Sequence, residues 1–172
     1  MISVLKKIKL IFTSIENTIV LALSQEFSKV RVYYYKKNGC KIHKSVVISP
    51  NVRITGKFEI DEGSSIAQNC SISGFEAGVI IGKNVMIAPN VVIVAFNHGF
   101  EDLEIPMALQ PNSEERVVIE DDVWIASNCT IGKGVTIGKG SIVAANSFVN
   151  KSVPQYSIVG GVPAKLIRSR NK

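Results

Sequence analysis

An aliphatic residue returns every six positions along most of this chain, with one slip of three residues and one longer interruption. The positions are Ile42, Ile48, Ile54, Ile60, Ile66, Ile72, Ile81, Ile87, Ile93, Ile119, Ile125, Ile131, Ile137, Val143 and Val149. An α-helix repeats at 3.6 residues and a strand at 2, so neither gives a strict period of six over about a hundred residues. The period predicts a solenoid in which each hexad is one short strand and one corner.

A second register supports this prediction, because four residues after each anchor comes a residue that is mostly small or β-branched. Its members are Val46, Val52, Ser64, Cys70, Val85, Val91, Val123, Cys129, Val135 and Ser141, with Phe58 as the large exception. Gly-Lys-Gly, Gly-Lys-Asn and Pro-Asn runs between the anchors suit tight corners. Three hexads close a coil of about eighteen residues, and stacked coils pair at about 4.8 Å around an aliphatic interior. The fold class is therefore all-β.

The flanks and interruptions divide the chain further. Residues 2–28 carry apolar residues near helical spacing, which predicts one amphipathic helix that packs on the solenoid or docks on a membrane surface. We expect a lead-in over 1–41, a β-helix over 42–160 and a basic segment over 161–172. The three-residue slip must bulge outward, and the excursion over about 99–112 is a functional loop candidate because it leaves a regular scaffold.

Composition limits the cellular setting and the partners. The formal charge of +6 and the pI near 9.3 favour anionic partners. Cys40, Cys70 and Cys129 are widely spaced and form no CxxC pair, which argues against disulfides and zinc and for a reducing, cytoplasmic compartment. The apolar N-terminal stretch is interrupted by polar residues and predicts neither a secretory signal nor a membrane span.

Only two histidines offer general-base chemistry. His43 lies among lysines on the first coil and is expected to be a surface residue without a chemical role. His98 stands immediately before the long excursion, where an ionisable ring can face a cleft. From the residues alone, a structural role for His98 stays open.

Three ordered motifs carry a family resemblance: the segment from Ile87 to His98, the run Asp122-Val-Trp-Ile-Ala-Ser-Asn128, and the run Ser157-Ile-Val-Gly-Gly-Val-Pro-Ala-Lys165. Together they resemble the hexapeptide-repeat acyltransferases, with sugar and polysaccharide O-acetyltransferases nearest and galactoside, maltose and streptogramin acetyltransferases as relatives. Ala126 departs from the glycine usual at its position. The resemblance implies a left-handed parallel β-helix and transfer of an acetyl group from acetyl-CoA, without a metal.

The resemblance also implies roles for individual residues. His98 is the expected general base that takes the proton of an acceptor hydroxyl during direct transfer, and a backbone N–H near Ala126 or Ser127 is the expected donor to the oxyanion. On the acceptor side the expected residues are Asn97, Glu76 and Phe75. On the acetyl-CoA side they are Trp124, Ala126, Ser127, Ala145, Asn150, Lys151, Lys165 and Arg168.

Partners and alternatives follow from the same reading. We expect a homotrimer with sites between subunits, a sugar or surface-polysaccharide precursor as acceptor, no nucleic acid, and possible contact of residues 1–28 with the inner face of the cytoplasmic membrane. The alternatives are N-acetylation of a nucleotide-linked amino sugar, acetylation of an antibiotic, and a non-catalytic scaffold or binding protein. A zinc carbonic anhydrase on the same solenoid needs three histidines, and this chain has two.

Overall fold

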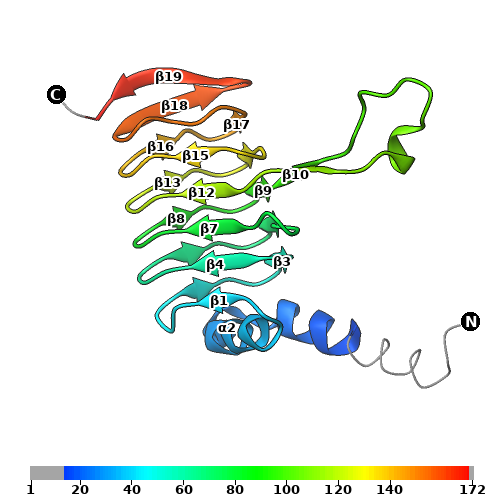
Figure 1. The fold of residues 1–172 in the computed structure, drawn as a ribbon. Coiled ribbons are helices and arrows are strands. Elements are labelled where there is room, and N and C mark those ends of the chain that lie inside the picture. Colours follow the sequence, from blue (N-terminus) through cyan, green and yellow to red (C-terminus); the bar gives the residue numbers. More distant parts are fainter. Residues whose placement is uncertain (1–13, 171–172) are drawn as a thin grey trace, which may run out of the picture.

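The computed structural model describes residues 14–170. It places the repeat in a stack of coils whose short strands form three sheets, one on each face of a prism (Figure 1). Sheet A holds β1 (Lys41–Ile42), β4 (Phe58–Ile60), β7 (Val79–Ile81), β12 (Val117–Ile119) and β15 (Thr136–Ile137). Sheet B holds β2 (Val47–Ile48), β5 (Ser65–Ile66), β8 (Met86–Ile87), β13 (Trp124–Ile125), β16 (Ile142–Val143), β18 (Ser157–Gly161) and β19 (Ala164–Ser169). Sheet C holds β3 (Arg53–Thr55), β6 (Ser71–Ser73), β9 (Val92–Val94), β14 (Thr130–Ile131) and β17 (Phe148–Val149). The left-handed parallel β-helix expected from the sequence is thus the fold.

The core of the prism consists of the two registers that the sequence predicts. All fifteen anchors are buried, and none exposes more than 8% of its surface. The second register is buried too, including Phe58 at 2%, whereas Glu76 and Asn97, which occupy that register beside the two interruptions, are exposed. Strands of two or three residues suffice because stacked strands pair in register, as Ile93 does with Ile72 below and Ile131 above. Each hexad therefore places two side chains inside and leaves its corner in solvent.

The corner between sheets B and C is a column of asparagines, which we call the asparagine corner: Asn51, Asn69, Asn90, Asn128 and Asn146. Each has a positive φ between 57° and 62°, a conformation that asparagine tolerates better than most residues. The first four side-chain amides each donate to the next amide oxygen along the column, at 3.0 to 3.4 Å. The repeated asparagine therefore serves both the turn and the stacking of coils.

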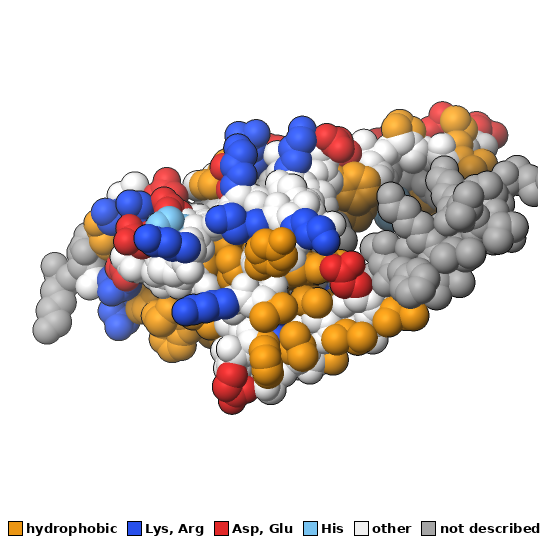
Figure 2. Space-filling model, turned by 90° about the horizontal axis from the view of Figure 1, so that it is seen from below, with side chains coloured by type: hydrophobic (Ala, Val, Ile, Leu, Met, Phe, Trp, Pro, Cys, Tyr) orange, Lys and Arg blue, Asp and Glu red, His pale blue; other side chains and the backbone are white. Residues whose placement is uncertain are grey.

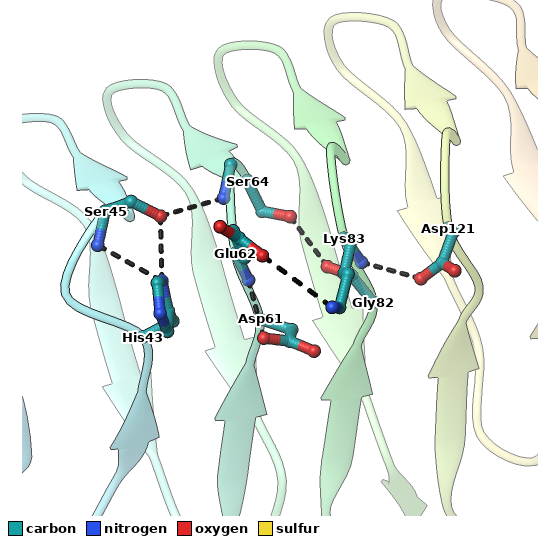
Figure 3. Close-up of polar contacts among 9 residues, drawn as sticks. His43, Ser45, Asp61, Glu62, Ser64, Gly82, Lys83 and Asp121 are labelled. Carbon is teal, nitrogen blue, oxygen red and sulfur yellow. Dashed lines mark hydrogen bonds and ion pairs between the residues drawn. The ribbon is translucent and has the colours of Figure 1, made fainter.

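The corner between sheets A and B is held by different polar contacts (Figure 3). The Ser45 hydroxyl lies 2.8 Å from His43 Nδ1 and accepts the Gly63 N–H, which links the first two coils. Farther along, the Lys83 N–H donates to Asp121 Oδ1 at 2.7 Å. His43 is half-buried and holds a turn, so its ring is more engaged than the surface position expected from the sequence.

The N-terminal segment differs from the single helix expected over 2–28. Residues 2–13 lie outside the described part, residues 14–22 are helical, and the chain then breaks into a 3₁₀ turn, η1 (Gln25–Phe27), and a second helix, α2 (Ser28–Lys37). The break is stabilised by Arg31, which is fully buried and donates to the carbonyl oxygens of Leu23, Ser24 and Ile48 at 2.8 to 3.1 Å. No helix within residues 14–170 has the length and apolar character needed to cross a bilayer.

Two excursions leave the prism at the corner between sheets C and A, which we call the loop corner. The first is the bulge over residues 74–78, between β6 and β7. The second is the loop over residues 98–112, which stands away from the prism (Figure 1) and contains the short turn η2 (Met107–Leu109). Its base is a two-stranded antiparallel ribbon of β10 (Phe96–Asn97) and β11 (Ser113–Glu114). Both interruptions of the period thus emerge at one corner.

Candidate active site at the loop corner

His98 lies at the base of the long loop, one residue after β10, and is exposed. Its ring meets Phe96 edge to face, with ring centres 5.8 Å apart and planes at 87°. Phe96 packs in turn on Phe75 of the bulge, at 4.2 Å between ring centres. Among residues 14–170 no hydrogen bond engages the imidazole nitrogens, so both are open to a ligand in the solvent-facing space beside the aromatic rings.

A single carboxylate joins the bulge to the base of the loop. Glu114 Oε2 accepts the backbone N–H groups of Glu76 at 2.9 Å and Ala77 at 3.0 Å. Arg116 Nε donates to the Ala77 carbonyl oxygen at 3.1 Å, and Lys57 Nζ lies 3.0 Å from Glu76 Oε2. The expected acceptor-side residues are therefore brought together, because Phe75, Glu76 and Asn97 all lie on these two excursions.

The loop over 98–112 is organised by its own contacts and exposes apolar side chains. Gln110 Nε2 donates to the Asp102 carbonyl oxygen at 2.7 Å, and Gln110 Oε1 accepts the Asp102 N–H at 3.2 Å. Leu103 is 94% exposed and Leu109 76%. Apolar side chains that are this exposed are typical of a surface that another molecule covers.

The expected oxyanion donors lie at the asparagine corner, away from His98. The Ala126 N–H is used in the ladder, since it donates to the Val143 carbonyl oxygen at 2.9 Å. The Ser127 N–H has no such partner among the described residues, which leaves it as the available donor of the two. Ala145 is exposed one coil above Ser127. The loop corner of this coil begins five positions after Ser127. At the usual rise of a strand, these groups therefore stand about 17 Å from the loop corner, across sheet C.

The remaining expected acetyl-CoA residues lie toward the C-terminal end. Asn150 and Lys151 are exposed at the loop corner, two coils above β9, beyond Lys133, whose Nζ donates to the Ser113 hydroxyl at 2.8 Å. Lys165 and Arg168 are exposed on β19, which folds back antiparallel to β18. The basic side chains thus gather around the upper coils.

Trp124 lies on the outer face of sheet B and is 43% exposed. Strand pairing puts it in one row with Val47, Ser65, Met86 and Ile142. Val47 is 40% exposed and Met86 54%. The expected site residues therefore fall on two corners and one face of a single chain, and the prism itself stands between them.

Three contributors to the loop corner escaped the sequence reading: Phe96, Glu114 and Arg116. Phe96 could have been predicted in principle, because it stands two positions before His98 and side chains at that spacing share one face of a strand. Glu114 and Arg116 gave no local signal, since they contact residues 37 to 39 positions earlier in the chain.

Metal ligands do not gather in the described residues, where no group of three His, Cys, Asp or Glu side chains could hold an ion. The three cysteines are unpaired thiols. Burial raises the pKa of Cys40, Cys70 and Cys129, so each thiol stays protonated at neutral pH.

The fold and three ordered motifs can be compared with known proteins. A hexapeptide-repeat acetyltransferase from Vibrio cholerae, solved with acetyl-CoA, is 34% identical, superposes with a TM-score of 0.70, and the match covers 83% of this chain and 78% of that one. The chain belongs to the hexapeptide-repeat acetyltransferase family. Family models agree: the bacterial transferase hexapeptide model matches residues 116–151, and the hexapeptide-repeat model of succinyl-transferases matches 65–95.

Two curated relatives of this hexapeptide-repeat protein come from Escherichia coli K12. WbbJ, provisionally named a lipopolysaccharide biosynthesis O-acetyl transferase, is 37% identical over 100 residues, which are 54% of this chain and 51% of WbbJ. WcaF, provisionally named a colanic acid biosynthesis acetyltransferase, is 29% identical over 158 residues, which are 91% of this chain and 84% of WcaF. The chain thus spans about half the length of WbbJ and most of WcaF.

Proposed function

We propose that this protein is an acetyl-CoA-dependent O-acetyltransferase that acts on a hydroxyl of a sugar or surface-polysaccharide precursor. The observation that carries the proposal is the placement of His98 at the base of an excursion, where it is exposed and its ring meets Phe96, which packs on Phe75. Among residues 14–170 neither of its ring nitrogens makes a hydrogen bond. Family membership supplies the acyl donor, since the Vibrio cholerae relative was solved with acetyl-CoA. The names of WbbJ and WcaF support a glycan acceptor.

His98 acts as general base in a direct transfer. As the acceptor hydroxyl oxygen attacks the thioester carbon, a ring nitrogen of His98 takes the hydroxyl proton, and the Ser127 N–H donates to the oxyanion. When the tetrahedral intermediate collapses, the carbon–sulfur bond breaks and the proton passes from His98 to the leaving thiolate. Protons and electrons balance without a metal or redox step. A well-placed base contributes roughly 10²- to 10⁴-fold.

A second copy of the chain completes the site. Ser127, Ala126 and Ala145 stand across sheet C from His98, about 17 Å away within one chain, which is too far for one acetyl group. A homotrimer, in which the asparagine corner of one subunit faces the loop corner of the next, brings the two sets together. The exposed apolar row around Trp124 and the apolar loop side chains supply surface for such contacts.

Acetyl-CoA then lies along the cleft between neighbouring prisms. Backbone groups near Ser127 and Ala145 meet the extended pantetheine arm, and Trp124 packs beside it. Asn150, Lys151, Lys165 and Arg168 are exposed around the upper coils, where cationic side chains can pair with the nucleotide phosphates. In this scheme residues 42–160 form the catalytic β-helix, residues 1–41 precede it, and residues 161–172 add basic groups.

The N-terminal end offers contact with the inner face of the cytoplasmic membrane. Ile15, Ile19, Phe27 and Val30, which we call the N-terminal patch, expose 40% to 57% of their surface. Figure 2 views this end and shows hydrophobic side chains beside lysine and arginine side chains. An apolar face flanked by cations suits the surface of an anionic bilayer, where a lipid-linked precursor is presented. The protein is then a cytoplasmic enzyme that docks reversibly on the inner face of the membrane.

Thiol release from acetyl-CoA tests the proposal, with a panel of sugars as acceptors and with wild type, His98→Ala and His43→Ala proteins. We expect acceptor-dependent release that falls at least a hundredfold in His98→Ala and persists in His43→Ala. Mass spectrometry of the product distinguishes an ester from an amide. Full activity of His98→Ala would remove the base from the mechanism, and failure of the wild type to bind acetyl-CoA would contradict the function.

A further inference from the structure

Phe75 holds a backbone conformation that a bulky residue rarely adopts. Its φ is +47°, in the left-handed region, and such positions cost of order 1–3 kcal/mol and cluster at functional sites. The bulge lies directly against Gly56, where a Cβ would collide with the Phe75 backbone. The Lys57 N–H also donates to the Phe75 carbonyl oxygen at 2.8 Å.

The Phe75 ring is not buried despite this strained backbone conformation, and it remains 38% exposed. A phenyl side chain that served only packing would be expected inside, as Phe58 is at 2%. Phe75 instead lies against Phe96 at 4.2 Å with planes tilted by 36°, and Phe96 meets His98. The two rings therefore make a partly exposed apolar surface that begins at the proposed base.

Glu114 connects the two segments that carry these rings. It pairs directly opposite Phe96 in the β10–β11 ribbon, and its carboxylate accepts the two N–H groups that follow Phe75, those of Glu76 and Ala77. Hydrogen bonds from two N–H groups to one ionised oxygen are stronger than neutral ones. Because Glu114 pairs with Phe96 and its carboxylate bonds the bulge that carries Phe75, it sets the separation of the two rings.

We propose that Phe75, supported by Phe96, is the platform on which the acceptor sugar ring stacks, and that Glu114 is the residue that positions it. A pyranose ring has a face of C–H groups with a small positive charge, which suits the negative face of an aromatic ring and excludes water from the contact. Its hydroxyls at the ring edge would then point toward His98. The proposal rests on the proposed function and specifies its acceptor class.

Steady-state kinetics test the platform through the split between the two substrates. Phe75→Leu is expected to raise the KM for the sugar at least tenfold while the KM for acetyl-CoA changes less than twofold. Phe75→Tyr keeps an aromatic face and is expected to raise the sugar KM much less than Phe75→Leu does. Tyr33→Leu, an exposed aromatic at the far end of the prism, is the matched control. A Phe75→Leu variant with wild-type sugar KM, or with both KM values raised equally, would overturn the platform.

Glu114→Ala tests positioning and Glu114→Gln is its rescue, since glutamine keeps an oxygen that can accept both N–H groups. We expect the alanine variant to raise the sugar KM at least fivefold and the glutamine variant to restore most of the affinity. A lower Tm in Glu114→Ala with an unchanged sugar KM would mean that Glu114 only stabilises the fold, and the positioning role would be wrong.

A binding measurement separates this inference from the proposed function. Saturation-transfer NMR of methyl glucoside, methyl galactoside and N-acetylglucosamine detects sugar contact without turnover, and the signal should weaken in Phe75→Leu but not in Tyr33→Leu. If these sugars bind in a Phe75-dependent way and no thiol is released with any acceptor, the platform stands and the transferase proposal fails. If none of them contacts the wild type, the platform fails even where acetyl-CoA binds.

Discussion

The Tyr35 hydroxyl donates a 2.6 Å hydrogen bond to the Val52 carbonyl oxygen, across the boundary between α2 and the first coil. Tyr35 is 4% exposed, and burial raises its pKa to about 12. Together with Arg31, it closes the interior at this end with polar groups that serve backbone carbonyls instead of solvent. The helix is therefore anchored by side-chain to backbone contacts as well as by apolar packing.

Tyr35→Phe is expected to lower the free energy of unfolding by about 1 kcal/mol at pH 7, the usual worth of one hydrogen bond. In alkali the Tyr35→Phe variant becomes the more stable of the two proteins. An unfolded tyrosine ionises near pH 10 and folded Tyr35 near 12, so between these values the unfolded chain binds fewer protons and wild-type stability falls by up to about 1.4 kcal/mol per pH unit. Urea unfolding at pH 7 to 12 should show the difference shrink and then invert; a constant difference would contradict this.

Ile93→Ala is expected to destabilise the protein by about 2–5 kcal/mol, because Ile93 is fully buried and its loss leaves a cavity between coils. Ile93→Val should cost only about 0.5–1.5 kcal/mol. Denaturant unfolding at fixed protomer concentration measures both, since association changes apparent stability. Val92→Ala, on the outer face of the same strand, is the control, and an equal loss there would place the core elsewhere.

Asn69→Ala is expected to cost about 1–2 kcal/mol, since alanine resists the φ of +62° found at this corner. Asn69→Gly should cost clearly less, because glycine accepts that φ and only two long hydrogen bonds, at 3.3 and 3.4 Å, are lost. Thermal unfolding of the two variants separates the contribution of the backbone conformation from that of the side-chain hydrogen bonds. Equal losses would mean that the amide ladder, and not the backbone conformation, requires asparagine.

Met86→Glu is expected to dissociate the proposed homotrimer, because it puts a charge beside Trp124 on the outer face of sheet B. Size-exclusion chromatography with light scattering should report three protomers for the wild type and one for the variant. Thr136→Glu, on the outer face of sheet A, should leave three. A monomeric wild type would contradict the proposed site between subunits.

The double variant Ile15→Asp/Ile19→Asp tests membrane docking through the N-terminal patch. The wild type should float with vesicles that contain phosphatidylglycerol and remain below with pure phosphatidylcholine vesicles, and the double variant should lose flotation. Leu166→Asp, at the opposite end of the prism and 63% exposed, should float as the wild type does. Equal recovery of wild type and double variant with the anionic vesicles would exclude this surface.

Much of the fold was predictable because the solenoid repeats one local rule. A side chain six residues after Ile87 reaches the same layer of the interior one face later, so burial at Ile93 follows from spacing without knowledge of any distant partner. The excursion was also visible, since residues that cannot join the period must leave the prism. His98 could be singled out because it borders that departure.

The parts that escaped prediction depend on contacts distant in sequence. Arg31 reads as one more cation in a lysine-rich segment, yet it is buried, and carbonyls from the residues just before η1 and from β2 converge on it. Glu114 likewise reads as a surface acid until the bulge, nearly forty residues earlier, is placed beside it. The continuous N-terminal helix was wrong past residue 22 for the same reason, since the break there is stabilised by partners that periodicity does not reveal.

The reversal of β19 has a consequence for the protein in a crowded cell. A parallel sheet ordinarily ends in a row of unpaired backbone groups that can recruit another strand and extend indefinitely. Here the last strand of sheet B runs backwards and carries Lys165, Arg168 and the neighbouring Arg170, while α2 covers the opposite end. A strand that approached this edge of sheet B would meet basic side chains and a reversed strand direction, so this sheet is protected from recruiting further parallel strands.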